Sequence, residues 1–212
     1  MGKLPIYYDG TRVEIADFIP EKYLKVLEIG CGEGGFRKNV SSNCEYWGIE
    51  PYVFSANIAK QKLDKVLVGT FERMLSELPD NYFDLVICND VIEHMYDHHQ
   101  FYRDIKSKCV HNAYMIGSLP NVRYIVNLYQ LLIKKEWRYK EEGILDRTHL
   151  RFFTLKSIEA DFIDAAFNIE ALKGINKISS KNILQRLKIK LAEFFLGEDI
   201  LYLQFAFRVK IK

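Results

Sequence analysis

The sequence has few cysteines and no long hydrophobic run. Its four cysteines are widely spaced and form no Cys-x-x-Cys pair, which argues against a disulfide scaffold and a cysteine-based metal site. No stretch approaches the roughly 18 uninterrupted apolar residues of a membrane-spanning helix. The N-terminus shows no basic region followed by an apolar one, as a signal peptide would. Together these absences predict a reduced, cytoplasmic protein.

Proline is also scarce, with five residues in 212, and low-complexity tracts and internal repeats are missing. Hydrophobic residues make up 49% of the chain and charged residues 27%, which is the balance of an ordinary globular protein. The length suits one α/β domain. The net charge of +2 is uneven, because acidic residues predominate before residue 134 and basic residues after it. A solvated basic face explains this excess, and contact with an anionic partner is the alternative.

Short apolar runs alternate with stretches of helical periodicity, which is the pattern of βαβ units on a parallel sheet. The predicted strands are Lys25–Ile29, Tyr46–Ile49, Lys65–Val68, Phe83–Cys88, Ala113–Ser118, Ile169–Ile175 and Leu201–Lys210. The predicted helices are Val13–Phe18, Phe36–Val40, Phe54–Lys62, Phe101–Lys108, Val122–Ile133, Ser157–Ala166 and Asn182–Leu196. The last strand mixes apolar and polar residues, which is typical of an edge or antiparallel strand.

A glycine-rich turn follows the first predicted strand, in the segment Val26-Leu-Glu-Ile-Gly-Cys-Gly-Glu-Gly-Gly35. Glycine lets the backbone turn tightly and pass close to a bound nucleotide, where a Cβ would collide. The next predicted strand ends at Glu50, whose carboxylate can accept hydrogen bonds from both hydroxyls of a ribose. The turn fits the dinucleotide fingerprint of nicotinamide and flavin enzymes, and equally the Glu-x-Gly-x-Gly-x-Gly pattern of S-adenosylmethionine-dependent methyltransferases.

The fourth predicted strand separates these two templates. It reads Phe83-Asp-Leu-Val-Ile-Cys-Asn89-Asp-Val-Ile-Glu-His94, which resembles the fourth-strand motif of class I methyltransferases of the small-molecule type. The resemblance covers residues 25–120 and implies an α/β fold, a Rossmann-like three-layer αβα sandwich. Its seven-stranded, mostly parallel sheet has the order 3-2-1-4-5-7-6, with strand 7 antiparallel. We therefore expect one methyltransferase domain over residues 1–212.

Within this domain, the resemblance implies four parts. They are an N-terminal leader (1–24), a cofactor-binding core (25–120), an acceptor-side insertion (121–155) and C-terminal helices and strands (156–212). Tyr7, Tyr8 and Arg12 in the leader could close over the cofactor or pack as a hydrophobic cover.

The resemblance also implies the cofactor, S-adenosyl-L-methionine, and the residues that bind it. Gly30 and Gly32 would lie against the methionine part, and Glu28 would help to bind its amino group. Glu50 would bind the ribose hydroxyls. The predicted cofactor-binding residues are Glu28, Gly30, Gly32, Glu50, Phe71 (near the adenine) and Asn89 (at the methionine end).

The acceptor is expected to be a small or carrier-linked molecule that presents an oxygen, because two histidines could act as the base that a hydroxyl requires. These are His94, after the fourth strand, and His149, in a segment that resembles a stretch after the fifth strand in a subgroup of bacterial methyltransferases. We expect this segment to line the acceptor site. Arg147 and Arg151 flank His149 and could hold an anionic group of the substrate. The alternative is that His149 and the arginines only fix the long loop in place.

The sequence also has features that suggest other functions. The pattern His94-x-x-x-His98-His99, with Glu93 and Asp97 beside it, suggests a metal site, because histidines four residues apart share a helix face. Zinc would still need a third ligand and groups that orient the ligands, and the His-Glu-x-x-His order is absent, so we expect no metal. Nucleic acid is not expected as a partner, because Asn89-Asp-Val-Ile replaces the Asn-Pro-Pro-Tyr loop of enzymes that methylate flipped bases. An NAD(P)-dependent oxidoreductase and a non-catalytic module with the methyltransferase fold remain as alternatives.

Residues 171–195 combine many lysines with an apolar helical face. Such a basic amphipathic helix can rest on an anionic membrane surface. It can equally pack on its own domain, or on a second subunit in a homodimer.

Overall fold

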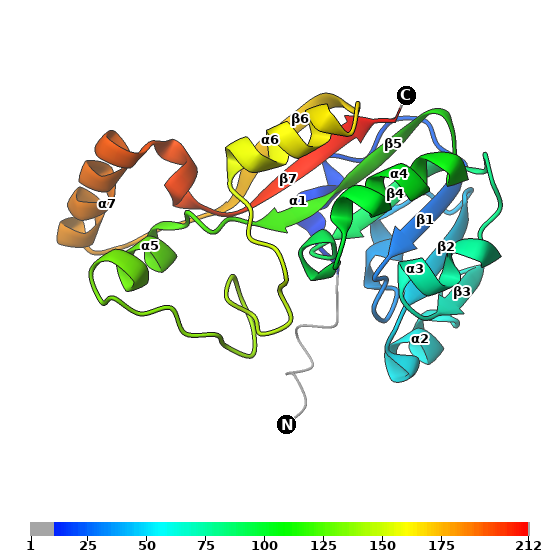
Figure 1. Ribbon diagram of the computed structural model, residues 1–212, viewed down its shortest axis with the longest axis horizontal. Coiled ribbons are helices and arrows are strands. Elements are labelled where there is room, and N and C mark those ends of the chain that lie inside the picture. The colour runs from blue at the N-terminus through cyan, green and yellow to red at the C-terminus, as the bar shows by residue number, and fades with distance from the viewer. Residues whose placement is uncertain (1–10, 212) are drawn as a thin grey trace.

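The computed structural model describes residues 11–211 and contains one seven-stranded sheet in the order β3-β2-β1-β4-β5-β7-β6 (Figure 1). The predicted leader residues Tyr7 and Tyr8 lie outside the described part of the chain. The strands are β1 (Lys25–Ile29), β2 (Glu45–Glu50), β3 (Lys65–Val68), β4 (Phe83–Asn89), β5 (Cys109–Pro120), β6 (Asn168–Lys177) and β7 (Tyr202–Lys210). The predicted strand order is confirmed.

Strands β1 to β5 pair in parallel, whereas β7 pairs antiparallel with both β5 and β6. The antiparallel direction of β7 agrees with its mixed sequence. The edge position that the same pattern allowed is wrong, because β6 occupies the edge and β7 lies inside the sheet. Of the polar residues of β7, Gln204 near its start lines the functional cavity described below, whereas Arg208 near its end pairs with Glu170 of β6 at 3.1 Å.

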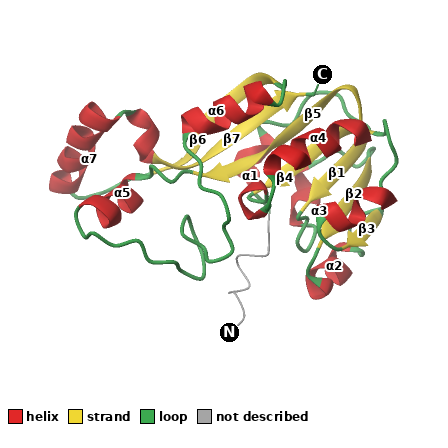
Figure 2. Cartoon of the chain, viewed as in Figure 1, coloured by secondary structure: helices red, strands yellow, loops and turns green. Residues whose placement is uncertain are grey.

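Helices cover both faces of the sheet, as a three-layer sandwich requires (Figure 2). The α-helices of the described chain are α1 (Val13–Ala16), α2 (Val53–Ala59), α3 (Phe71–Met74), α4 (His98–Lys108), α5 (Ile125–Leu132), α6 (Leu155–Asp164) and α7 (Ile183–Leu196), of which α5 and α7 do not cover the sheet. Short 3-10 helices occupy Gly35–Asn39, Leu75–Glu77, Ile92–His94 and Glu198–Leu201. Helix α3 was not predicted, because four residues are too few to show a helical period.

Successive residues of the central strands alternate between two hydrophobic clusters. Leu27 in β1 and Val86 in β4 pack on the face covered by α3, α4 and α6. Val26 and Leu85, one position away, pack on the face covered by α1 and α2. Side chains of a strand point to opposite faces in turn, so apolar residues at every position are what a sheet covered on both sides requires.

Helices α5 and α7 lie away from the sheet, beyond one end of β6 and β7 (Figure 1). None of the residues of α7 is buried. Within residues 11–211, no helix combines the length and the hydropathy needed to cross a bilayer.

Candidate functional site

A cavity of about 1190 Å³ opens at the carboxyl ends of the parallel strands β1, β2 and β4. Ligands of open α/β sheets bind at this edge, where the strand order reverses. All the predicted cofactor residues and both predicted histidines line the cavity: Glu28, Gly30, Gly32, Glu50, Phe71, Asn89, His94 and His149. The fold thus brings together residues that the sequence spreads over more than one hundred positions.

The glycine turn leaves room for a ligand against its backbone. Gly30 and Gly32 have φ values of +71° and +52°, in the left-handed region that favours glycine. A Cβ at Gly30 would lie 2.6 Å from Cγ2 of Val91, so that position is closed by packing. A Cβ at Gly32 would meet nothing within 4 Å, so it would project into open space. This arrangement fits a cofactor that lies directly on the turn.

The carboxylate of Glu50 is held in place by the backbone. The N–H groups of Gly32 and Tyr52 donate hydrogen bonds to its two oxygens, at 2.9 and 2.8 Å. These bonds stabilise the charged form, but burial outweighs them and raises the pKa of Glu50 above its ordinary value. A carboxylate fixed in this way can accept further hydrogen bonds from a diol without reorganising.

Glu28 is the second buried carboxyl group of the cavity. It is 3% exposed, and the hydroxyl of Tyr46 donates a hydrogen bond of 2.9 Å to its Oε2. Burial raises the pKa of Glu28 to about 8, and the negative charge of Glu50 adds to this effect. Without a cation nearby, Glu28 is therefore mostly protonated at neutral pH, and a bound ammonium group would favour its charged form.

The amide of Asn89 provides a direct sign that the cavity is made for a ligand. Both Nδ2 and Oδ1 of Asn89 are buried, and neither has a hydrogen-bond partner. Buried polar atoms are almost always paired in folded proteins, so an orphaned amide at a cavity wall fits a ligand that would pair with it.

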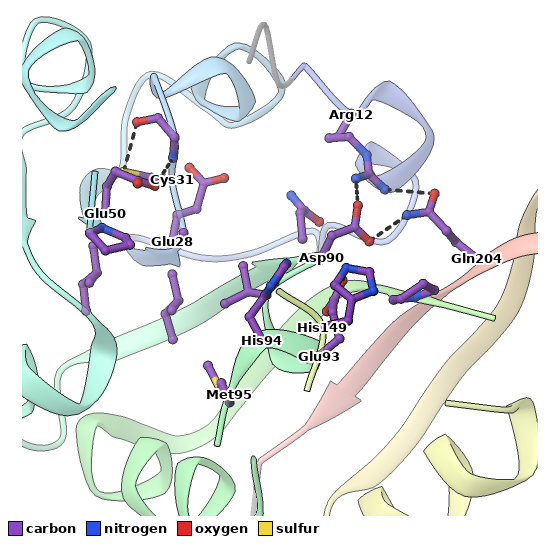
Figure 3. Close-up of a pocket in the computed structure, with 18 of the residues that line it drawn as sticks. Arg12, Glu28, Cys31, Glu50, Asp90, Glu93, His94, Met95, His149 and Gln204 are labelled. Carbon is purple, nitrogen blue, oxygen red and sulfur yellow. Dashed lines mark hydrogen bonds and ion pairs between the residues drawn. The ribbon is translucent and has the colours of Figure 1, made fainter. Parts of the chain in front are cut away.

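The wall that faces the glycine turn carries a polar network that the sequence did not reveal (Figure 3). Asp90 accepts hydrogen bonds from Oγ of Ser118 at 2.8 Å and from Nε2 of Gln204 at 2.7 Å. The guanidinium of Arg12 pairs with the same carboxylate and also donates to Ser118 at 3.0 Å. Three distant parts of the chain thus meet at Asp90, which adopts a left-handed backbone with φ of +53°.

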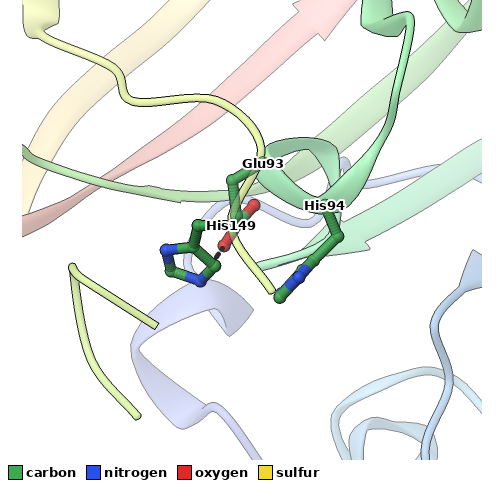
Figure 4. A group of neighbouring side chains, drawn as sticks. All are labelled: Glu93, His94 and His149. Carbon is green, nitrogen blue, oxygen red and sulfur yellow. Dashed lines mark ion pairs between the residues drawn. The ribbon is translucent and has the colours of Figure 1, made fainter. Parts of the chain in front are cut away.

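The predicted histidines lie together beside Glu93 (Figure 4). The ring centroids of His94 and His149 are 4.7 Å apart, and Nε2 of His149 lies 3.9 Å from Oε1 of Glu93. Nδ1 of His149 is 2.9 Å from the carbonyl oxygen of Ile144, and Nδ1 of His94 is 3.1 Å from that of Thr148. A carbonyl only accepts, so Nδ1 carries the proton in each neutral ring and Nε2 carries the lone pair.

Glu93 itself is completely buried. Neither of its carboxyl oxygens has a hydrogen-bond partner, and burial raises the pKa of Glu93 well above its ordinary value. Its backbone carbonyl accepts hydrogen bonds from the N–H groups of Leu150 and Arg151, at 2.8 and 3.1 Å. These two bonds bring the segment of His149 to the loop that follows β4.

The predicted arginines do not line the cavity. Arg147 is exposed and forms an ion pair of 2.8 Å with Glu141. Arg151 donates hydrogen bonds to the carbonyl oxygens of Leu150 and Tyr96. Their role in holding an anionic group therefore stays a prediction, while their observed contacts are with the protein itself.

The histidine pattern after β4 divides between two places. Nε2 of His98 pairs with Asp161 of α6 at 3.1 Å, and the ring of His98 stacks on that of His99. His94 instead turns toward His149. His94 and His98 therefore do not share a helix face, because a 3-10 turn ends at His94 and α4 begins only at His98.

Comparison with known proteins places the chain in a family. A family model for a methyltransferase domain matches residues 10–172, which is most of the chain, and the chain belongs to this family. It is 28% identical over 165 residues to the ubiquinone biosynthesis O-methyltransferase of Azorhizobium caulinodans. That match covers 74% of this chain but only 63% of the relative, so the chain spans less than two thirds of the relative's length.

Solved structures show the same fold. A SAM dependent methyltransferase from Archaeoglobus fulgidus superposes with a TM-score of 0.63 at 20% identity, over 99% of this chain and 95% of that one. A possible histamine N-methyltransferase from Thermotoga maritima gives a TM-score of 0.65 at 17% identity, over 97% and 88% of the two chains. The chain thus belongs to a methyltransferase family and has the class I fold, and the cofactor of this family is S-adenosyl-L-methionine. Of the two templates for the glycine turn, the methyltransferase pattern applies.

Replacing Glu50 with Gln should weaken binding of S-adenosylhomocysteine by about tenfold to a hundredfold. A hydrogen bond to a charged group contributes about 1.5–3 kcal/mol, and the amide keeps the volume but removes the charge. Isothermal titration calorimetry measures the change. The exposed Glu77, in a 3-10 helix that does not line the cavity, gives the matched control Glu77→Gln. Equal affinity in Glu50→Gln and Glu77→Gln would contradict the assignment.

Glu28 should make the ligand-free protein less stable as the pH rises. Its pKa is about 8 in the folded state and about 4.5 ordinarily, so between these values the unfolded chain loses a proton that the folded chain keeps. The free energy of unfolding then falls by up to about 1.4 kcal/mol per pH unit from this group. Urea unfolding at several values between pH 5 and pH 8 should show a smaller fall in Glu28→Gln than in the wild type. Parallel pH profiles would disprove the raised pKa.

Proposed function

We propose that the protein transfers the methyl group of S-adenosyl-L-methionine to an oxygen atom of a small or carrier-linked acceptor. The observation that carries this proposal is the position of two imidazoles with Nε2 lone pairs at the cavity that holds all the predicted cofactor residues. An oxygen acceptor must lose a proton on methylation, and these are groups suited to that task. The name of the Azorhizobium relative, an O-methyltransferase, supports the same acceptor atom.

The main contribution of the chain to methyl transfer is positioning. The cofactor supplies an electrophilic methyl group on a positively charged sulfur, and transfer is an in-line displacement. Orienting two reactants can account for about 7–11 kcal/mol of a barrier. Gly32 leaves space at the turn, Glu50 offers a fixed carboxylate, and Asn89 offers an unpaired amide. These groups would hold the cofactor, while the cavity between Glu93 and the Asp90 network would hold the acceptor.

Deprotonation of the acceptor would take place at Glu93, His94 and His149. His149 is held by its hydrogen bond to Ile144, so its Nε2 has a fixed direction toward Glu93.

The four cysteines are free and buried, which fits the proposed cytoplasmic location of the reaction. A non-catalytic module with the same fold would bind the cofactor but transfer no methyl group.

Loss of His149 should lower O-methylation by about 10²- to 10⁴-fold, the usual contribution of a proton-transfer group. The assay would use S-adenosylmethionine with a radioactive methyl group and a panel of phenols, catechols, sugars and carboxylic acids. Mass spectrometry would then locate the methyl group in any product. His149→Gln would be compared with His111→Gln, because His111 is exposed on β5 and does not line the cavity.

Two results would contradict the proposed function. One is a product methylated on nitrogen or carbon, and the other is equal turnover by His149→Gln and the wild type. Cofactor binding without transfer to any acceptor of the panel would favour the non-catalytic module.

A further inference from the structure

We propose that Glu93, His94 and His149 form a binding site for one divalent transition-metal ion. The three residues offer one carboxylate oxygen and two imidazole nitrogens, and these atoms all lie within 4.8 Å of one another. Two histidines and a carboxylate form a common ligand set of catalytic zinc, and the same set binds iron in other enzymes. The proposal replaces the expectation, drawn from the sequence, that no metal is bound.

The hydrogen bonds around the cluster orient both imidazoles as metal ligands. A histidine that binds a metal through one nitrogen usually donates the other N–H to a carbonyl or carboxylate. His94 and His149 both meet this condition through Thr148 and Ile144, respectively. The bonds fix the tautomer with the lone pair on Nε2, which is the nitrogen of His149 that faces Glu93.

Glu93 supplies an independent indication. Its carboxyl group is 0% exposed and neither oxygen has a hydrogen-bond partner, which is a costly arrangement for a polar group. A bound cation would provide the missing partner and would balance the charge of the ionised group. In the second histidine cluster the carboxylate already has a partner, because Asp161 pairs with Nε2 of His98, and the buried atom without a partner is Nδ1 of His98.

The site also has room for a further ligand, because all three residues line the cavity. A metal ion with an open coordination position lowers the pKa of a bound hydroxyl or water. Resting on the proposed oxygen acceptor, a bound ion would occupy the Nε2 lone pairs of both imidazoles, which would then act on the acceptor through the ion. The ion would lower the pKa of the acceptor's hydroxyl, whose proton would pass to water. The metal site itself does not depend on that acceptor.

Metal binding can be measured without cofactor or acceptor. Chelator-treated protein would be titrated with Co²⁺, whose visible absorption reports coordination by nitrogen and oxygen, and then with Zn²⁺ as a competitor. We expect one ion per chain and a metal affinity at least about tenfold lower in His94→Gln and Glu93→Gln. Even residues that only hydrogen-bond to the ligands contribute about 10–100-fold to metal affinity. His94 is exposed, so its variant should fold even if that of the buried Glu93 does not.

His111→Gln and His99→Gln are the controls, and both should bind Co²⁺ as the wild type does. Absence of stoichiometric binding would overturn the proposal, as would equal affinity in His94→Gln and the wild type. Loss of binding in His99→Gln would move the ion to the other cluster and would also overturn it. If this protein methylates an oxygen atom but binds no metal ion, the metal site is disproved and the proposed function stands.

A separate observation concerns α7, and from it we infer a docking surface for an anionic lipid membrane. Six large apolar side chains on one face of this helix are between 60% and 82% exposed: Ile183, Leu184, Leu187, Leu191, Phe194 and Phe195. The partly covered residues of the helix are Ile189, Ala192 and Glu193, on its other side. The apolar face therefore points away from the rest of the described chain.

Charge identifies the occupant of this face. Arg186 and Lys190 border the apolar stripe on one side, and Lys188 borders it on the other, all of them exposed. Basic side chains on both flanks of an apolar stripe are typical of helices that lie in the plane of a membrane with acidic headgroups. A second copy of the chain docked on this face would lie next to these same basic side chains, and it would have to supply acidic groups to neutralise them.

Sedimentation with vesicles tests this surface. The wild type should bind vesicles of phosphatidylcholine with phosphatidylglycerol and should bind phosphatidylcholine alone much less. Phe194→Asp should reduce binding at least tenfold, whereas Phe54→Asp should not, because Phe54 is equally apolar and 68% exposed but lies on α2.

Absence of binding to the acidic vesicles would overturn the inference, as would equal binding by Phe194→Asp. Light scattering adds a third outcome. A stable homodimer that becomes monomeric in Phe194→Asp would assign the face to a second copy of the chain and not to lipid.

Discussion

The hydrogen bonds from the backbone of Leu150 and Arg151 to the carbonyl oxygen of Glu93 hold the segment of His149 against the loop that follows β4. Residues 134–150 form no helix, and most of their other backbone hydrogen bonds are internal. A further bond joins Val122 to Phe153, where this segment leads into α6. Because the contact is made by backbone atoms, it fixes the position of His149 without using the side chain of Glu93. That carboxyl group remains directed at the histidines, which is the arrangement that the proposed function and the proposed metal site both require.

Buried carboxyl groups give the cavity its electrostatic character. Glu28, Glu50 and Glu93 all line it, and burial raises the pKa of each. A positive charge near such groups favours their ionised forms, so binding of a cationic ligand and ionisation of the carboxyl groups reinforce each other. S-adenosylmethionine carries positive charge on its sulfonium and ammonium groups, and the product lacks the charge on sulfur. The same electrostatics would therefore hold the substrate form of the cofactor more tightly than the product form.

The sequence predicted those parts of the protein that depend on local pattern. Apolar runs located all seven strands to within a few residues, and the glycines at 30 and 32 marked backbone of positive φ. The network around Asp90 could not be predicted in this way. Its hydrogen bonds to Arg12 and Gln204 join residues 78 and 114 positions apart, and neither partner stands in a pattern of its own. The pairing of His94 with His149 is also long-range, since it depends on where the segment after α5 is held.

The place of β7 has a consequence for how the chain acquires its structure. β6 is made before β7 but pairs only with it, because β7 inserts between β5 and β6. During synthesis on the ribosome, β1 to β5 can therefore assemble in order, while β6 has no strand to pair with. β5 meanwhile presents an open edge of hydrogen-bonding groups, which is a common start of misassembly. Gln204 arrives with β7, so one wall of the cavity forms only in this last pairing step, after the residues of the glycine turn are already in place.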